Sequence, residues 1–487
     1  MAPSPPPPPP HLVLLPSLGR GHLIPMLELS TRLAARGFII SLLLAPHHSP
    51  FARNRLAVES SSLDIRLLEL DLPPNDTVNP QIQLNSNAKA SNNTNHHLSP
   101  LVTLSQTLQR PVETLLAQMF LPGVDEPPPP LCIISDFFLA WTVEVAAKFG
   151  IPRINMETSP AYSMNIVDVL WSHLPRTLSR TASGRYVVPG QAKPMVLCAS
   201  ELTPGMAEAD ESHPKHLLYS RLFATNRQGS WATVSNTFYE LEGDHIEQFQ
   251  SRYAGPVRPV GPLLRLGGGR PASPEIEFLD RQAPGSVVYV SFGSENSISC
   301  GETIELALGL EASGKAFLWV LRRPSDVGTG APGSDFLPDG FSARTGHRGR
   351  LVCGWTDQLA VLSHPAVGAF ITHCGWNSAL EGIACGVPMI CWPLYAEQTL
   401  NAKFITEEAF CGLRMQKGPS REDIRRVVNG LIDADADAAD DGARAVKENA
   451  RKWKEIAKAA VSEGGSSAKN LDSLVEGILS LQKSKSC

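Results

Sequence analysis

Short apolar runs alternate with helical spacing of apolar residues at the start of the chain. Residues 12–15 form an apolar run, the next segment places apolar residues on one helical face and ends at Gly37, and residues 38–44 form a second run. Strands that are apolar along their whole length are typical of parallel sheets with helices on both faces. The pattern therefore predicts an α/β fold that opens with a β-α-β unit.

The same rhythm returns further along the chain. Residues 132–135 have the pattern of a buried strand and lead into a predicted helix at 141–149. A second series begins with a strand at 287–290, continues with a helix at 303–310 and reaches another strand at 317–321. Two series of this kind predict two α/β halves, each built on a parallel sheet.

Glycine and proline cluster between the two series, at residues 254–274, which is typical of a linker. An Asn- and Ser-rich stretch at 72–99 indicates a surface loop, and the prolines near the N-terminus indicate a polyproline tail. We predict an N-terminal domain at 1–253 with a disordered tail at 1–10, a linker at 254–285, a C-terminal domain at 286–466, and a helix at 467–487 that packs back on the N-terminal domain.

Composition excludes several classes of protein. Of 487 residues, 43% are hydrophobic and 19% charged, and the formal net charge of −5 gives no reason to expect a nucleic-acid partner. No apolar run approaches the roughly 20 residues that span a bilayer, so we expect no stable membrane insertion. The N-terminus lacks the basic segment of a secretory signal, and the nine cysteines are scattered without a CxxC pair. These features predict a cytoplasmic protein in which Cys374, Cys385 and Cys391 are core residues.

Residues 355–398 carry a dense motif, WTDQLAVLSHPAVGAFITHCGWNSALEGIACGVPMICWPLYAEQ. In length, order and nearly every diagnostic residue, this segment resembles the signature box of plant UDP-dependent glycosyltransferases. The resemblance extends to shorter segments in both halves of the chain, at 21–26, 236–242, 259–262 and 291–294. It implies two facing Rossmann-like domains of the GT-B type, the first binding an acceptor and the second a UDP-sugar, with the active site in the cleft between them.

The centre of the box has the pattern of a phosphate site. Residues 367–372 read as a strand, 373–376 as a turn and 377–385 as a helix. A helix N-terminus after a parallel strand offers unpaired N–H groups and a positive dipole end, which suit a diphosphate. The resemblance assigns the diphosphate to Ser294, His373, Trp376, Asn377 and Ser378, the ribose to Glu381, the rest of the nucleotide to Trp355, Thr356 and Gln358, and the sugar to Glu397, Gln398 and Thr158.

The box departs from the family pattern at two places. Thr356-Asp357 replaces the commoner Ala-Pro, where the contact with uracil is largely through the backbone. Glu397 replaces the commoner Asp, which lengthens a sugar-binding arm by one methylene. Gln398 favours glucose, because an amide can both donate to and accept from adjacent equatorial hydroxyls.

His22 and Asp136 form the predicted catalytic pair. His22 follows the first strand, and the resemblance makes it the general base, a role for which an imidazole with a pKa of about 6.5 is suited. Asp136 follows the strand at 132–135, and parallel sheets gather such strand ends at one edge. We expect the carboxylate to orient the ring and to stabilise the imidazolium.

The resemblance implies a transferase that moves a sugar, glucose by preference, from a UDP-sugar to a hydroxyl of a small-molecule acceptor. The implied step is a single in-line displacement that inverts the anomeric carbon. We expect no cofactor, because the UDP-sugar is a co-substrate, and we expect a monomer. Phenolic, flavonoid, terpenoid and hormone acceptors all remain open, as do N-, S- and C-linked products.

Three other functions fit parts of the pattern. Residues 19–21 begin like the fingerprint of an NAD(P)-dependent oxidoreductase, but Ile24 occupies the place of the third glycine. Residues 433–437 resemble the DxD motif of a metal-dependent glycosyltransferase, but they lie in an Ala- and Asp-rich stretch remote from any strand end. A non-catalytic binding protein would be favoured if the catalytic pair were missing, and both of its members are present.

We predict that transfer needs no metal ion. The helix N-terminus, His373 and Ser294 can supply the counter-charge of the diphosphate, and the sequence shows no convincing metal cluster. Initial rates with UDP-glucose in excess EDTA should therefore equal those with added Mg²⁺ or Mn²⁺. If EDTA abolished activity and either ion restored it, the predicted diphosphate site would be contradicted.

Overall fold

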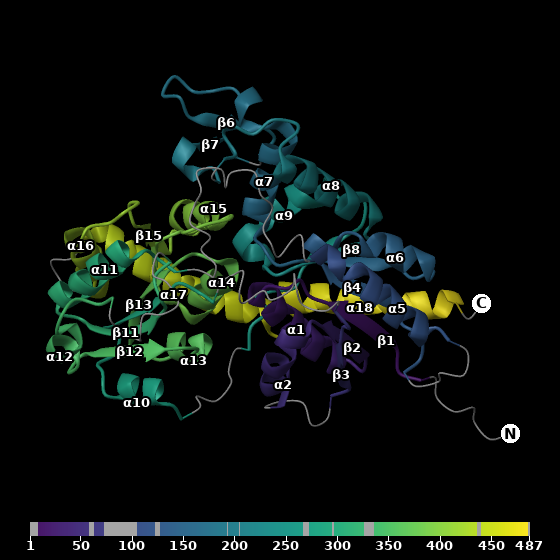
Figure 1. The fold of residues 1–487 in the computed structure, drawn as a ribbon, viewed down its shortest axis with the longest axis horizontal. Helices are drawn as coiled ribbons and strands as arrows, with labels where there is room; N and C mark the ends of the chain where they lie inside the picture. Colours follow the sequence, from purple (N-terminus) through teal and green to yellow (C-terminus); the bar gives the residue numbers. More distant parts are fainter. Residues whose placement is uncertain are drawn as a thin grey trace. The chain divides into compact units, whose positions relative to one another are not determined.

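The computed structural model separates into two compact units (Figure 1). It describes residues 8–57, 63–72, 105–121, 127–191, 193–203, 205–265, 272–294, 297–325, 336–435 and 440–485. The first unit comprises residues 1–199, 204–264 and 460–487, and the second comprises residues 200–203 and 265–459. Each unit is therefore assembled from segments that are not continuous in the sequence.

Within the described residues, the first unit contains a seven-stranded parallel sheet in the order β3-β2-β1-β4-β5-β8-β9. The strands are β1 (His11–Leu15), β2 (Ile39–Leu44), β3 (Ile65–Glu69), β4 (Cys132–Asp136), β5 (Arg153–Glu157), β8 (Ala232–Ser235) and β9 (Val257–Pro259). The α-helices are α1 (Arg20–Ala34), α2 (Ser49–Ala57), α5 (Gln109–Met119), α6 (Thr142–Lys148), α7 (Ala161–His173), α8 (Pro214–Gly229), α9 (Tyr239–Gln250) and α18 (Ser466–Lys485). A short antiparallel pair, β6 (Tyr186–Val188) and β7 (Met195–Leu197), lies outside the main sheet.

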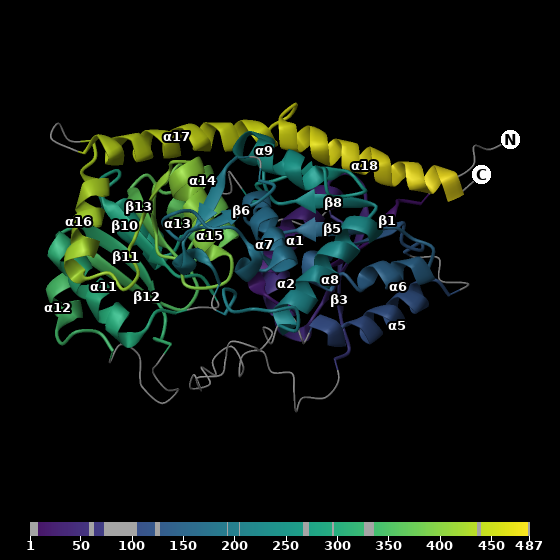
Figure 2. The ribbon, with the colours of Figure 1, turned by 90° about the horizontal axis from the view of Figure 1, so that it is seen from above.

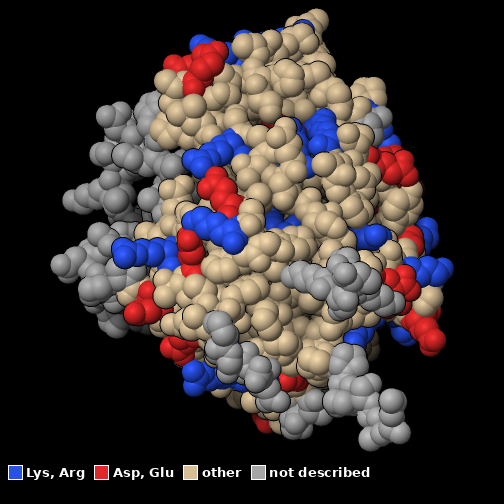
Figure 3. Space-filling model, turned by 90° about the vertical axis from the view of Figure 1, so that its right-hand side faces the viewer, with Lys and Arg blue, Asp and Glu red and all other residues tan. Residues whose placement is uncertain are grey.

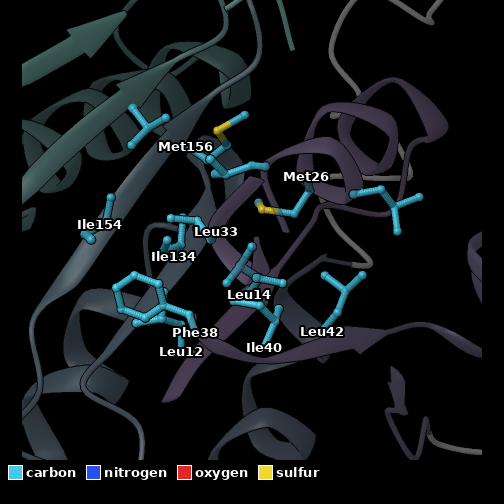
Figure 4. Packing of buried hydrophobic residues seen from close by; sticks show 14 of the residues in the cluster. Leu12, Leu14, Met26, Leu33, Phe38, Ile40, Leu42, Ile134, Ile154 and Met156 are labelled. Atoms are coloured by element: carbon cyan, nitrogen blue, oxygen red, sulfur yellow. The ribbon is translucent and has the colours of Figure 1, made fainter. Parts of the chain in front are cut away.

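The two faces of this sheet build two separate cores, because side chains alternate across each strand. Leu12 and Leu14 of β1 pack with α1, α2 and α18 in the cluster that Figure 4 shows. Val13 and Leu15 point the other way and pack with α5 and α6. Figure 2 shows α18 on one side of the strands and α5 and α6 on the other. Helices on both faces explain why these strands are apolar along their whole length.

The described part of the second unit contains a six-stranded parallel sheet in the order β12-β11-β10-β13-β14-β15. The strands are β10 (Val287–Ser291), β11 (Ala316–Leu321), β12 (Gly349–Cys353), β13 (Val367–Thr372), β14 (Met389–Cys391) and β15 (Gly412–Arg414). The helices are α10 (Pro274–Asp280), α11 (Cys300–Ser313), α12 (Phe341–Thr345), α13 (Gln358–Leu362), α14 (Trp376–Cys385), α15 (Gln398–Lys403), α16 (Arg421–Ile432) and most of α17 (Asp441–Val461).

The predicted α/β fold with two parallel sheets is confirmed, and the predicted strands and helices recur with small shifts at their ends. The helix predicted at 303–310 is α11, which begins three residues earlier. Its start follows from a capping box in which Ser299 and Glu302 exchange hydrogen bonds, and its end from the left-handed Gly314. The capping residues therefore start α11 three residues before the position that apolar spacing alone predicted.

The predicted linker at 254–285 is divided between the two units. Its first part adds β9 to the edge of the first sheet, and Arg32 of α1 lies beside the residues that follow β9. The Arg32 guanidinium donates to the backbone oxygens of Val260, Pro262 and Leu264, at 3.2, 2.9 and 3.2 Å. The Gly- and Pro-rich composition suggested a free linker, but a distant side chain holds this part on the first unit.

The last helix, α18, belongs to the first unit although it ends the chain (Figure 1). Leu471, Leu474 and Ile478 are buried in the same core as Leu12 and Leu14. The polar side of α18 also makes specific bonds, because the Asn470 side-chain amide donates to the backbone oxygen of Pro259 at 3.0 Å. Apolar packing and hydrogen bonding together attach the helix beside β9.

Some sequence-based expectations fall on residues outside the described ranges, among them most of the polyproline tail and nearly all of the loop at 72–99. None of the cysteines that the structure describes forms a disulfide bond with another of them. Cys374, Cys385 and Cys391 are buried, in agreement with their prediction as core residues.

Two surface properties bear on partners. Among the described residues, no helix is both long enough and apolar enough to cross a lipid bilayer. On the face that Figure 3 shows, Lys and Arg side chains are interspersed with Asp and Glu side chains, and no single basic patch gathers there.

Candidate active site

Strand order reverses at one point in each sheet, and the candidate residues lie at these two points. In the first sheet β1 lies between β2 and β4, and in the second β10 lies between β11 and β13. Ligands of open α/β sheets bind at such reversals, outside the carboxyl ends of the strands. The turns that follow β1, β4, β10 and β13 are therefore the places where chemistry is expected.

His22 and Asp136 meet at the carboxyl ends of β1 and β4. His22 lies in the first turn of α1, and its Nδ1 is 2.7 Å from Oδ2 of Asp136. Asp136 is fully buried, whereas the His22 side chain is 25% exposed. The other carboxylate oxygen accepts a hydrogen bond from the backbone N–H of Phe138 at 3.0 Å. Both oxygens of Asp136 are thus fixed, and they set the orientation of a ring that reaches the surface.

Thr158 contacts the same ring nitrogen. Its Oγ1 lies 2.9 Å from Nδ1 of His22. A carboxylate can only accept, so Nδ1 carries the proton and shares it between Asp136 and the Thr158 oxygen. In the neutral ring the lone pair then lies on Nε2, the nitrogen that a general base needs. The sequence assigned Thr158 to the sugar, whereas the structure places its hydroxyl on His22, because β5 ends beside β4.

Aromatic rings extend away from His22. Phe138 meets the imidazole edge-on with 5.6 Å between ring centroids, and Tyr219 meets Phe138 at 6.3 Å. Trp171 stacks on Tyr219 at 5.8 Å with nearly parallel planes. Phe138 and Tyr219 are half-buried, so they present apolar surface next to the catalytic pair. These rings come from three separate elements, which is why no local pattern in the sequence grouped them.

In the second unit, two glycine-containing turns enclose His373. A Cβ atom on Gly293 or Gly375 would come within 2.7 or 2.5 Å of the ring, so only glycine fits at either place. Within the described residues, Nδ1 of His373 has no hydrogen-bond partner. Burial, with Arg322 nearby, lowers the pKa of His373 to about 4. The ring is therefore neutral at pH 7 and offers a phosphate an N–H group, not the positive charge that the sequence suggested.

The turn after His373 leads directly into α14, whose N-cap is Gly375 and has no side chain to cap the helix. Asn377 is half-buried and Ser378 is buried in the first turn of the helix. Trp376 is also buried, and its ring meets Phe404 edge-on at 6.0 Å, so its indole packs in the core. Ser294 lies exposed in the turn after β10. The N-terminus of α14 thus retains the features that bind anions.

A short chain of hydrogen bonds holds Glu381, the residue assigned to the ribose. The Tyr289 hydroxyl of β10 donates to Oε1 of Gln358 at 3.2 Å. The amide of Gln358 then donates to Oγ of Ser378 at 2.8 Å and to Oε2 of Glu381 at 2.5 Å. Because the Glu381 carboxylate can only accept, the N–H group of the Gln358 amide must face it, which turns the Gln358 oxygen toward the Tyr289 hydroxyl. The orientation of the Glu381 carboxylate therefore depends on a tyrosine outside the box.

Gln398 and Glu397 begin α15 at the end of the box. Gln398 is buried, and its Oε1 accepts from the backbone N–H groups of Leu394 and Tyr395, both at 3.0 Å. Both lone pairs are used, so the side chain presents only N–H donors. Because the preceding turn binds the oxygen of Gln398, the N–H groups of its amide are the part left to meet a sugar. Glu397 is half-buried and follows Ala396, which has a left-handed backbone with φ 56°.

The part of the box assigned to uracil is open to solvent. Trp355 is 60% exposed, so its ring presents a flat surface, and Thr356 beside it is half-buried. Asp357, which stands where the family commonly has Pro, is the N-cap of α13 and accepts from the backbone N–H of Ala360 at 3.1 Å. This departure therefore replaces one helix-starting residue with another.

The acidic stretch at 433–437 is used for ion pairs. Asp433 pairs with Lys315 at 2.5 Å, and Asp435 pairs with Lys447 at 2.9 Å. Asp437 lies outside the described residues. In the part of the chain that the structure describes, no group of three or more His, Cys, Asp or Glu side chains could hold a metal ion.

Comparisons with known proteins identify the family. Residues 268–437 match the family described as UDP-glucoronosyl and UDP-glucosyl transferase. Scopoletin glucosyltransferase from Nicotiana tabacum is 32% identical over 502 aligned residues, which cover 96% of this chain and 98% of that protein. The chain belongs to the plant UDP-glycosyltransferases. The same chain is 32% identical to UDP-glycosyltransferase 73E1 from Stevia rebaudiana, and the alignment covers 96% of each of the two chains.

A solved structure extends the likeness to the whole fold. The structure of Phytolacca americana UGT2 with UDP-2-fluoro-glucose and pterostilbene has a TM-score of 0.76 and 31% identity, covering 96% of this chain and 99% of that one. The transferase therefore has the GT-B architecture of two parallel-sheet domains. Its activity is the transfer of a sugar from a UDP-sugar to a small-molecule acceptor.

Sequence reasoning on this transferase missed the residues that support its sites. Phe138 stands two positions after Asp136, so inspection of the turn after β4 could have found it. Tyr289 stands inside an apolar strand, where its hydroxyl was the only signal, and nothing in the sequence pairs it with Gln358. Contacts between strands and distant helices decide such roles.

Removal of the Tyr289 hydroxyl should weaken UDP binding by the transferase. In Tyr289→Phe the Gln358 carbonyl loses its donor, so the Glu381 carboxylate is held less firmly. One hydrogen bond contributes about 1 kcal/mol, so the Kd for UDP from isothermal titration calorimetry should rise about fivefold. Tyr253→Phe removes another buried hydroxyl, in the first unit, and should leave the Kd unchanged. Equal affinities of wild type and Tyr289→Phe would contradict this role.

Proposed function

We propose that this transferase is an inverting glucosyltransferase that forms an O-glucoside from UDP-glucose and a hydroxyl of a small aromatic acceptor. The observation that carries the proposal is the 2.7 Å contact between His22 Nδ1 and Asp136, with Thr158 on the same nitrogen. It leaves the lone pair of the ring on Nε2, as a general base supported by a carboxylate requires.

The proposed step is a single displacement. The acceptor hydroxyl gives its proton to Nε2 of His22 while its oxygen attacks the anomeric carbon of the sugar. The bond from that carbon to UDP breaks on the opposite side, so the configuration inverts and UDP leaves with the bonding electrons. His22 becomes an imidazolium, and the buried Asp136 carboxylate stabilises its charge.

The second unit would hold the donor. Negative charge that develops on the departing UDP would fall at the N-terminus of α14, where the helix dipole and the neutral N–H of His373 stabilise it. The further donor contacts in this proposal are Ser294, Asn377, Ser378 and the backbone of Trp376 for the diphosphate, Glu381 for the ribose, and Trp355, Thr356 and Gln358 for the rest of the nucleotide. Thr158 is proposed to donate its own hydroxyl proton to the sugar while it accepts from His22.

Glucose is the proposed sugar, on the chemistry of Glu397 and Gln398. Gln398 presents N–H donors, since its oxygen is bound to the backbone, and the neighbouring Glu397 carboxylate supplies acceptor oxygens. Together the two side chains offer both kinds of partner to adjacent equatorial hydroxyls. The glucosyltransferase from tobacco and the complex with UDP-2-fluoro-glucose, reported above, support this choice.

The proposed acceptor is a planar aromatic compound with a free hydroxyl. The half-buried ring of Phe138 lies against His22, the half-buried Tyr219 continues the aromatic surface, and the buried Trp171 stacks on Tyr219. An aromatic acceptor could pack on these rings in an offset or edge-on geometry while its hydroxyl reaches Nε2. The relative named for scopoletin and the structure with pterostilbene are in line with this class.

We further propose that the enzyme needs no cofactor or metal, works as a monomer and resides in the cytoplasm. Ion pairing of Asp433 and Asp435 supports independence from metal. The described cysteines form no disulfide with one another, which supports a reducing compartment.

His22→Ala should lower kcat by at least about a hundredfold with a phenolic acceptor, which is the typical effect of losing a general base. The Kd for UDP-glucose should change little, because the proposed donor contacts lie almost entirely in the second unit. Asp136→Asn should give a smaller loss of kcat, since it keeps the shape of the side chain and removes its charge. Steady-state kinetics and calorimetry measure both quantities.

The two losses should not be additive in the double variant, because both residues act on one proton transfer. A carboxylic-acid acceptor is an internal control, since it is already ionised at pH 7 and should depend less on His22. Near-wild-type kcat of His22→Ala on an alcohol or phenol acceptor would rule out this mechanism.

The donor preference is tested separately. The kcat/KM of the wild type should be higher for UDP-glucose than for UDP-galactose, because the two sugars differ only in the orientation of the 4-hydroxyl. A Gln398→Ala variant should lose much of this difference while its Kd for UDP stays the same. A higher kcat/KM of the wild type for UDP-galactose would contradict the assignment of glucose as the donor sugar.

A further inference from the structure

Arg153 is a charged side chain buried beside the catalytic pair. It begins β5, next to β4, and its exposed fraction is 2%. Burial of a guanidinium is costly unless its N–H groups find acceptors. The acceptors of its N–H groups therefore indicate the role of this residue.

All five N–H groups of the Arg153 guanidinium donate hydrogen bonds. The acceptors are Ser135 Oγ for Nε (2.8 Å), Ser230 Oγ (2.7 Å) and Asn226 Oδ1 for Nη1, and the backbone oxygens of Ser135 (3.2 Å) and Asp136 (3.0 Å) for Nη2. None of these five acceptors is a carboxylate oxygen. Arg153 thus binds neutral groups at the carboxyl end of β4, and it is not one half of an ion pair.

The same network continues through the turn that follows Asp136. Ser135 Oγ and Thr142 Oγ1 are 2.6 Å apart, and Thr142 donates to the backbone oxygen of Leu139 at 2.6 Å. The Asn226 amide donates to the backbone oxygen of Phe137 at 3.0 Å. Four backbone oxygens between residues 135 and 139 are therefore held by one buried network with Arg153 at its centre.

The charge of Arg153 adds a second effect. Burial lowers the pKa of the guanidinium to about 9, while the nearby Asp136 carboxylate acts in the opposite direction. Arg153 is therefore charged at pH 7, and its positive charge offsets part of the desolvation of the buried carboxylate. Lys cannot reproduce a planar fork with five donors, and its pKa falls more readily on burial than that of Arg.

We propose that Arg153 is a positioning residue of the transfer reaction, which fixes the end of β4 and so holds Asp136 where it orients His22. The inference rests on the proposed role of His22 as the base. A displacement of about 1 Å in a catalytic group can lower the rate about a hundredfold. A residue that contacts neither the substrate nor the imidazole can therefore control kcat.

Arg32 provides a matched control for a purely structural role. It is also an arginine of the first unit whose pKa is lowered by burial, and it also donates to backbone oxygens, those of Val260, Pro262 and Leu264. Its acceptors belong to the segment after β9 and not to the end of β4. Replacement of either arginine by Lys removes the planar fork of donors.

The experiment compares Arg153→Lys with Arg32→Lys in Tm, in KM for UDP-glucose and in kcat with a phenolic acceptor. We expect both variants to have a lower Tm. Only Arg153→Lys should lower kcat, by at least about tenfold, with KM for UDP-glucose unchanged. A kcat of Arg153→Lys equal to that of Arg32→Lys would overturn the proposal.

The Asp136→Ala background tests whether the effect runs through Asp136. In that background Arg153→Lys should change kcat less than about twofold, because the side chain that it positions is gone. An equal loss of kcat in both backgrounds would also overturn the proposal. If Arg153→Lys fails to fold, Asn226→Ala is measured in its place, because this change removes one acceptor of Arg153 and the donor to the backbone oxygen of Phe137. A folded Asn226→Ala variant with the kcat of the wild type would also overturn the proposal.

His22→Ala, measured in parallel, separates the two proposals. High activity of this variant would contradict the base and with it the proposed function. An inactive His22→Ala together with unchanged kcat in Arg153→Lys would contradict only the role of Arg153.

Discussion

Parallel pairing of β1 with β4 places the ends of two distant segments side by side, and the chemistry of the first unit depends on this pairing. His22 and Asp136 are 114 positions apart in the chain, yet both follow strands that run in the same direction and end at the same edge of the sheet. The second unit uses the same constraint. Pairing of β10 with β13 brings the turn at Gly293 against His373, with no room for a side chain on the glycine. In each sheet the order of strands reverses at this pair, so the site lies where no crossover helix covers it.

Burial of polar groups near these strand ends has a cost, and hydrogen bonds offset it. Asp136 is fully buried, and its carboxylate is bound by His22 and by the backbone of Phe138. Arg153 is buried behind it and has an acceptor for each donor. A satisfied network in a low-dielectric interior is rigid, because any displacement leaves a donor or acceptor without a partner. The exposed part of the pair is the imidazole, which is the part that has to meet an acceptor.

Hydrogen bonds also hold unusual backbone conformations in the signature box at residues 355–398. Cys374 and Ala396 adopt left-handed conformations, with φ 64° and 56°, in the turns that lead to α14 and α15. Such a conformation costs a non-glycine residue about 1–2 kcal/mol, so the surrounding contacts must hold it. Asn401 supplies one of them by donating to the backbone oxygen of Cys374, and Gln398 supplies others by binding the turn before α15. Residues that read in the sequence as ligand contacts therefore also build the turns that shape the site.

Apolar runs and a 44-residue motif are local signals, so they were sufficient to predict the family, the α/β class and the positions of most strands. The sequence also singled out His22 and Asp136 by their places after two strands. The contacts of those residues, in contrast, depend on the folded chain. Folding placed Thr158 on the imidazole, made His373 neutral through burial, and turned the oxygen of Gln398 toward the backbone. It bound the segment after β9 to Arg32 and gave Arg153 five acceptors at the end of β4. The physical reason is that hydrogen bonding and desolvation depend on distances between residues far apart in the chain, and a linear pattern carries no such distances.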